Sequence, residues 1–220
     1  LPHKKLMFGK LPRLTWQEAM EKYGVDKPDL RFDMEIQTVS DVVLGSGFKV
    51  FEDALKNGVV HALRVPGGAK FSRKEIDELT EIAKIHEAKG LAYITIESDG
   101  TVKSPIAKFF SEEQMKKIVE VTGAQIGDIV FFGADKFSVV CASLGAVRLA
   151  CGDKLGLRDS EVLAPLCVYN FPLMEFSKEE QKLVPSHHPF TSPLDEDVHL
   201  MDLHPEKVRA KAYQLKRLKN

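Results

Sequence analysis

The sequence is poor in cysteine, in net charge and in long apolar runs. Its three cysteines, Cys141, Cys151 and Cys167, include no Cys-x-x-Cys pair and support neither a disulfide framework nor a zinc site. We expect reduced thiols packed as small apolar groups in a cytoplasmic protein. The formal net charge of −1 argues against a polybasic nucleic-acid binder but leaves room for a local basic face.

The sequence shows no pattern typical of a membrane-spanning segment or of a signal peptide. No apolar run approaches the roughly 20 residues that cross a bilayer, so we expect no membrane partner. The basic start at residues 1–5 is not followed by the apolar stretch of a signal peptide. The 220-residue sequence begins without methionine, which leads us to expect a piece of a longer protein.

Helix starts are clear in the sequence. Residues 15–18, 72–75 and 111–114 each place Ser or Thr three residues before Glu or Gln, the pattern of a capping box. Apolar residues at helical spacing follow the second and third starts, and another such stripe runs from Phe137 to about Gly152. These stripes predict helices that bury one face in a core.

Segments rich in β-branched and aromatic residues lie between the predicted helices and indicate strands. The predicted strands are 48–51, 59–65, 91–97 and 129–132. A turn at Asp99-Gly100 leads to a partner strand within 101–110, which Pro105 confines to the edge of a sheet. Alternating strands and helices predict a compact α+β unit over residues 45–152.

The flanking residues, 1–44 and 153–220, have too few elements to bury a core unaided. The second flank contains an apolar strand at 164–171 and a helix predicted from about Pro205. We therefore expect the unit at 45–152 to be inserted between two incomplete parts of a larger domain.

Two adjacent histidines, His187 and His188, stand between Pro185 and Pro193. Proline removes a backbone donor and favours extended geometry in the residue before it, so we expect a fixed, extended loop. Imidazole can donate, accept, bind a metal or titrate near neutral pH, which suits a substrate site. A surface turn with two solvated histidines explains the same residue types.

Other polar patterns have ordinary structural explanations. The glycine-rich segment 65–69 could form an anion-binding nest, but a structural turn is the expectation. Asp195 and Asp197 alternate as metal ligands can, although a solvated acidic loop explains them better. Scattered cations could face RNA, but solvated helix faces are expected. These cations are Lys70, Arg73, Lys74, Lys103, Lys108, Lys116, Lys117 and Arg148.

Six segments, in order, resemble signatures of bacterial-type aspartyl-tRNA synthetases. They are Tyr-Gly-Val-Asp-Lys-Pro-Asp-Leu-Arg at 23–31, Ala-Leu-Arg-Val-Pro-Gly-Gly-Ala at 62–69, Ala-Lys-Gly-Leu-Ala-Tyr at 88–93, Ile-Val-Phe-Phe-Gly-Ala-Asp at 129–135, Leu-Gly-Ala-Val-Arg-Leu at 144–149 and His-His-Pro-Phe-Thr-Ser-Pro at 187–193. The resemblance extends from about residue 12 to residue 213.

The resemblance implies that residues 45–152 are the GAD insertion domain, which a tRNA-dependent amidotransferase subunit shares. It implies that 1–44 and 153–220 are parts of a class II catalytic domain, an antiparallel sheet with helices. The full-length protein would be an aspartate–tRNA ligase that uses ATP and magnesium, acts on tRNA and forms a homodimer. His187 would contact the bound L-aspartate, with His188 beside it in the site.

This sequence departs from the family pattern at two places: Gln214 and Asn170 stand where the family tends to have Asp. The family segments that carry the ATP and magnesium contacts are not in the chain. We therefore predict that the chain alone is an inactive monomer with no complete catalytic, cofactor or metal site. The alternative is a non-catalytic GAD-type module that binds tRNA or packs on a synthetase or amidotransferase partner.

Overall fold

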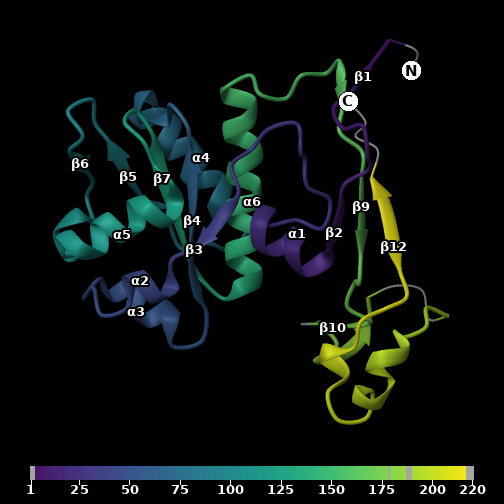
Figure 1. The fold of residues 1–220 in the computed structure, drawn as a ribbon. Helices are drawn as coiled ribbons and strands as arrows, with labels where there is room; N and C mark the ends of the chain where they lie inside the picture. Colours follow the sequence, from purple (N-terminus) through teal and green to yellow (C-terminus); the bar gives the residue numbers. More distant parts are fainter. Residues whose placement is uncertain (1–2, 178, 187–189, 217–220) are drawn as a thin grey trace. The chain divides into compact units, whose positions relative to one another are not determined.

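The computed structural model describes residues 3–177, 179–186 and 190–216 (Figure 1). The chain divides into two compact units. Unit 1 combines Leu1–Met20 with Ser160–Asn220, and unit 2 is Glu21–Asp159.

Unit 2 is built on a five-stranded antiparallel sheet with the strand order β3-β4-β7-β5-β6. Its strands are β3 (Ile36–Thr38), β4 (Val59–Val65), β5 (Ala92–Ile96), β6 (Val102–Lys103) and β7 (Ile129–Asp135). The two central strands, β4 and β7, pair along their full lengths. They are apolar on both faces because helices cover both faces, so neither strand shows the usual polar alternation.

Alternate residues of the central strands enter two separate cores, as the two-residue period of a strand requires. Leu63 and Phe131 pack with the helices α4 and α6, whereas Ala62 and Phe132 pack with α2, α3 and α5. These helices are α2 (Ser40–Val43), α3 (Lys49–Leu55), α4 (Arg73–Ile85), α5 (Glu112–Thr122) and α6 (Phe137–Lys154).

The three predicted capping boxes are all present. The side chains of Ser72 and Ser111 each accept a hydrogen bond from the backbone N–H three residues later. The side chain at that later position, Glu75 or Gln114, accepts one from the serine's backbone N–H. At the start of α1 (Trp16–Tyr23), Thr15 Oγ1 accepts from the Glu18 N–H and Glu18 Oε2 accepts from the Thr15 N–H, at 3.1 and 2.7 Å. These local signals therefore set where the helices begin.

The strand predicted at 48–51 is wrong, because these residues begin helix α3. Phe51 is buried against Phe132 with ring centroids 5.7 Å apart, and Phe48 lies edge-on to Phe51. A short aromatic run can serve a strand or one face of a helix equally well. Packing on the sheet decides for the helix here.

The partner strand expected within 101–110 is at the sheet edge, as predicted, but β6 has only two residues. After β6, the contact with β5 continues through a side chain, because Ser104 Oγ donates a hydrogen bond to the Tyr93 carbonyl at 2.6 Å. A 3-10 turn at Ala107–Phe109 follows Pro105. Pairing along β5 therefore ends with the Ser104 hydroxyl, and Pro105 follows where a longer strand would have continued.

Unit 1 has three small sheets. They pair β1 (Lys5–Leu6) with β8 (Val162–Leu163), β10 (Met174–Ser177) with β11 (Lys182–Pro185), and β9 (Leu166–Tyr169) with both β2 (Arg13–Thr15) and β12 (Tyr213–Lys216). The β12–β9 pair is antiparallel and the β2–β9 pair is parallel. A small cluster of Leu173, Val208 and Ala210 is buried beneath the β10–β11 hairpin and the 3-10 turns η3 (Asp195–Leu200) and η4 (Pro205–Lys207).

The helix predicted from Pro205 is wrong. Pro205 opens a single 3-10 turn, and the chain then extends to form β12. Residues 213–216 alternate apolar and polar side chains, which suits a strand once β9 is available as its partner.

The observed architecture confirms the α+β class. The compact unit Glu21–Asp159 extends beyond the predicted insertion 45–152 at both ends. Compactness does not define an inserted domain, so the boundaries 1–44, 45–152 and 153–220 stay a prediction. None of the described helices combines the length and apolar character that crossing a bilayer requires. None of the three cysteines, all of which the structure describes, is in a disulfide, and burial raises the pKa of the Cys141 and Cys151 thiols to about 12.

Candidate functional site

The predicted aspartate-binding residues, His187 and His188, lie outside the described residues. The described residue just before them is well anchored. The Ser186 N–H donates to the Leu173 carbonyl at 3.0 Å, directly after strand β11. Its buried Oγ has no hydrogen-bond partner in the described part of the chain.

The far end of the histidine segment is anchored as well. The Leu194 N–H donates to the Arg209 carbonyl, and the Lys211 N–H donates to the Ser192 carbonyl, both at 2.8 Å. Pro193 and Ala210 form an isolated antiparallel bridge between these two bonds. The described residues on both sides of the histidines are therefore held by backbone hydrogen bonds.

Asp197 holds that backbone in place. Its carboxylate accepts from the Arg209 N–H at 2.9 Å and from the Arg209 guanidinium at 2.7 and 2.8 Å. These bonds to Arg209 lower the pKa of Asp197 to about 2, against the opposing effect of burial. We call Asp195, Glu196, Asp197, Arg209 and Lys211 the acidic clasp, because Glu196 also pairs with Arg209 and Asp195 with Lys211.

The expectation of a solvated acidic loop is confirmed for Asp195, whose side chain is 88% exposed although it pairs with Lys211. It is wrong for Asp197, which is 5% exposed and paired with Arg209. The cations that pair with them come from residues 209–211, too far along the chain for local sequence patterns to show. Among the described residues, no group of three or more His, Cys, Asp or Glu side chains is placed to hold a metal ion.

Unit 2 contains the second polar centre, around Arg148. This residue was expected on a solvated helix face, but it is 1% exposed. Its guanidinium donates to four backbone carbonyls, at 2.8 to 3.2 Å. Those carbonyls belong to Asp29, Phe32, Asp33 and Met34. The other seven cations named with it in the sequence are exposed, as predicted.

Aromatic rings complete the environment of Arg148. Its guanidinium carbon lies 4.1 Å from the Phe32 ring centroid and 4.9 Å from that of Tyr23. Burial lowers the pKa of Arg148 to about 10, so the side chain stays charged at neutral pH. A buried cation needs such compensation, and the carbonyl dipoles and ring faces supply it. Arg148 therefore fixes the course of residues 29–34.

Two glycines let this loop approach helix α6. A Cβ at Gly24, whose φ is +71°, would collide with the Cys141 carbonyl, and one at Gly145 would lie 3.0 Å from the Tyr23 carbonyl. Glycine permits both the left-handed conformation and the close backbone contact. Segments 23–31 and 144–149 thus meet through their glycines and through Arg148.

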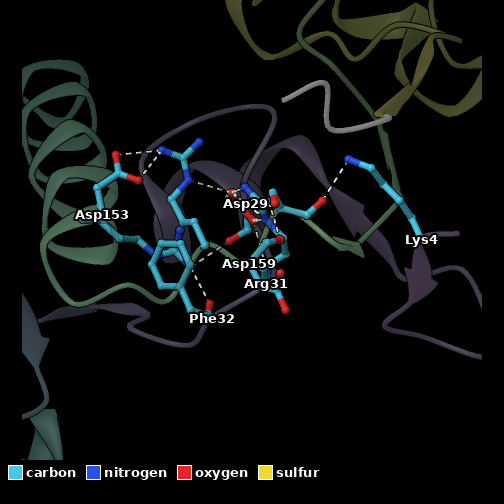
Figure 2. Close-up of polar contacts among 9 residues, drawn as sticks. Lys4, Asp29, Arg31, Phe32, Asp153 and Asp159 are labelled. Atoms are coloured by element: carbon cyan, nitrogen blue, oxygen red, sulfur yellow. Dashed lines mark hydrogen bonds and ion pairs between the residues drawn. The ribbon is translucent and has the colours of Figure 1, made fainter. Parts of the chain in front are cut away.

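The same loop carries a buried carboxylate, Asp29 (Figure 2). It accepts from the Arg31 guanidinium at 2.7 Å and from Arg158 Nε at 3.2 Å. Burial raises the pKa of Asp29, but its hydrogen bonds to Arg31 and Arg158 and the charge of Arg31 outweigh that effect and lower the pKa. Arg158 also donates to Asp153 at the end of α6, so the loop is tied to that helix by charge as well.

The glycine-rich segment 65–69 is a structural turn, as predicted. Asp128 fills the role that a bound anion would have taken. Its carboxylate accepts from the Gly67 N–H at 2.9 Å, from the Gln125 N–H at 2.9 Å and from Arg64 Nε at 2.6 Å. This arrangement joins segment 62–69 to the start of β7.

Known proteins are similar to this chain over most of its length. The model of the GAD domain family matches residues 51–144. Aspartate–tRNA(Asp/Asn) ligase of Bacillus subtilis (strain 168) is 51% identical over 207 residues, which are 93% of this chain and 35% of that protein. Aspartate–tRNA ligases of Clostridium perfringens (strain SM101) and Staphylococcus carnosus are 51% and 48% identical, over 93% and 94% of the chain.

Over more than nine-tenths of its length the chain is therefore similar to bacterial aspartate–tRNA ligases, and its residues 51–144 match the GAD domain family. It spans about a third of the length of the curated relatives that it matches. Five of the six signature segments lie in unit 2, on strands β4, β5 and β7, on helix α6 or in the loop that Arg148 holds. The sixth includes the histidines.

The sequence patterns did not predict the burial of two residues of structural weight, Arg148 and Asp197. The signal for Arg148 was present, because it is the one charge within the apolar stretch 139–152 of helix α6. A cation at that place is expected to be buried and to need several acceptors. Asp197 gave no comparable signal, since three acidic residues in a row normally face solvent.

Proposed function

We propose that this chain is a part of an aspartate–tRNA ligase, in which the whole protein activates aspartate with ATP and transfers it to tRNA. The observation that carries the proposal is about 50% identity to named ligases over 93% of the chain, with the six signature segments in order. The whole protein is proposed to be a cytoplasmic homodimer, and the 220-residue chain a monomer.

His187 is proposed to contact the bound L-aspartate, with His188 beside it. The anchoring of Ser186 and Leu194 supports this role, because a binding residue on a loop needs fixed ends to hold its geometry. A single charge-assisted hydrogen bond contributes about 1.5–3 kcal/mol. Millimolar binding needs about 4 kcal/mol, so this contact alone does not retain aspartate.

ATP and magnesium belong to the proposed reaction of the whole ligase. Magnesium would neutralise charge on the phosphates of ATP there. The described residues contain no group of three or more His, Cys, Asp or Glu side chains that could bind magnesium, so they do not fit a magnesium site. For the same reason the chain by itself is proposed to be inactive in adenylate formation.

The test is aspartate-dependent ATP–pyrophosphate exchange by the whole ligase with His187→Ala. Loss of a bond of this kind raises the KM for aspartate about 10- to 100-fold, since 1.4 kcal/mol corresponds to a factor of ten. His199→Ala, an exposed histidine on η3, is the matched control and leaves KM unchanged. An unchanged KM in His187→Ala contradicts the assigned role. Aspartate-dependent exchange by the 220-residue chain alone contradicts its proposed inactivity.

A further inference from the structure

One cavity of unit 2 is lined by none of the residues that surround the buried Arg148. It has a volume of about 400 Å³ and lies between the start of α4, the turn before that helix and the β5–β6 edge. Cavities of this size accept small organic ligands. All the residues that line it belong to unit 2.

The floor of this cavity is apolar and aromatic. Phe71 and Ile76 are buried parts of the core at this place, and Tyr93 packs on Phe131 with ring centroids 6.2 Å apart. Ser104 braces the wall, because its Oγ donates to the Tyr93 carbonyl and accepts from the Ile106 N–H. The floor is therefore preformed, and a flat apolar group can lie on it without repacking.

The rim carries two cations that are available to a ligand. Lys103 has no side-chain hydrogen bond or ion pair within the described part of the chain. Arg73 pairs only with Asp77 one turn along α4, at 3.1 Å, and both side chains are more than half exposed. Exposed pairs of this kind contribute little to stability, so an incoming anion can replace Asp77 at small cost.

One acceptor completes the rim. Glu97 accepts from the Thr95 hydroxyl through Oε1 at 2.9 Å, and no bond to its second oxygen is present among the described residues. The cavity thus offers an apolar floor, two cations at one side and a carboxylate oxygen that can accept from an N–H or O–H group.

We propose that this cavity binds one nucleotide, either a free 5′-mononucleotide or an unpaired nucleotide of an RNA. The base lies on Phe71, Ile76 and Tyr93, since stacking on such a floor is available to every base. The phosphate lies between Arg73 and Lys103, and Glu97 accepts from a base amino group or a ribose hydroxyl. An isolated phosphate would leave the floor uncovered, and an apolar ligand would bury the cations without a partner.

The experiment titrates the 220-residue chain with three probes at low salt: AMP, a 5′-phosphorylated single-stranded RNA tetranucleotide and inorganic phosphate. Binding is followed by calorimetry and by NMR shifts of the residues that line the cavity. We expect AMP or the RNA to bind at least tenfold more tightly than phosphate. Comparable affinity for AMP and RNA assigns a free nucleotide, whereas a clear preference for the RNA assigns an unpaired RNA nucleotide.

The double variant Arg73→Gln with Lys103→Gln weakens this binding at least tenfold and flattens its salt dependence, because two phosphate contacts are lost. Lys74→Gln with Lys117→Gln makes the same charge change at exposed positions outside the cavity and leaves binding unchanged. Far-UV circular dichroism verifies that both variants fold. Absence of binding by AMP and RNA, equal binding of phosphate, or equal loss in both double variants overturns the proposal.

Discussion

Unit 2 buries apolar side chains on both faces of one five-stranded sheet, whereas unit 1 has three small sheets and the acidic clasp. In unit 2 the polar centre at Arg148 is added to a large apolar core. In unit 1 the described segment next to the histidines depends on Asp197 and Arg209. The comparison shows that the described residues next to the histidines are held by hydrogen bonds and charge, whereas the unit that contains the GAD match is held mainly by apolar burial.

Arg148→Met is the sharpest test of the polar centre in unit 2. It leaves four backbone carbonyls without their donor inside the protein, and we expect a loss of about 3–5 kcal/mol in the free energy of unfolding. Urea unfolding measures the loss, and hydrogen exchange locates it at residues 29–34. Arg148→Lys keeps the charge and loses less. A loss below about 1 kcal/mol would show that the apolar core alone holds this loop.

Gly24→Ala tests the close approach of the loop to helix α6, with an internal control. The added Cβ collides with the Cys141 carbonyl, and the alanine has to keep the left-handed backbone conformation of Gly24. We therefore expect the free energy of unfolding to fall by about 2–4 kcal/mol. Gly67→Ala has a similar φ of +67° with nothing within 4 Å of the added Cβ, and it costs about 1–2 kcal/mol. Thermal unfolding of the two variants compares them. Equal losses would show that backbone conformation, not contact, sets the requirement.

The response to pH separates the two units by a smaller effect. Burial lowers the pKa of His61 in unit 2 below its ordinary 6.5, so the unfolded state binds the proton more readily. Stability of unit 2 therefore falls as pH drops below about 6.5. Asp197 in unit 1 has a lowered pKa of about 2, so its contribution is complete above the ordinary 3.8 and is lost as pH falls from there toward 2.

Hydrogen exchange of each unit between pH 7 and pH 3 measures this contrast. His61→Phe removes the dependence near pH 6 in unit 2, and Asp197→Asn removes the acid-side dependence in unit 1. Asp195→Asn, at an exposed pair with Lys211, is the matched control and changes little. If the two units lost their protection from hydrogen exchange at the same pH, the predicted difference in their pH dependence would be refuted.

Local sequence signals predicted much of unit 2 and little of unit 1. The capping boxes at Ser72 and Ser111 and the strands β4 and β7 were found because caps and continuous apolar runs act over a few residues. The helix α3 and the strand β12 were assigned wrongly. Each is a short segment whose conformation depends on a partner distant in the chain, Phe132 for α3 and β9 for β12.

The sequence by itself determined the α+β class, which follows from the periodicity of its apolar residues, and the similarity to bacterial aspartyl-tRNA synthetases, which follows from six ordered motifs. Only the tertiary structure decided that Arg148 is buried and that Asp197 is clasped by Arg209. It also brought Arg73, Lys103 and Tyr93 to one cavity. The physical reason is the same in each case. Burial, ion pairing and cavity lining join residues that lie from about ten to more than a hundred positions apart, and no local pattern records those distances.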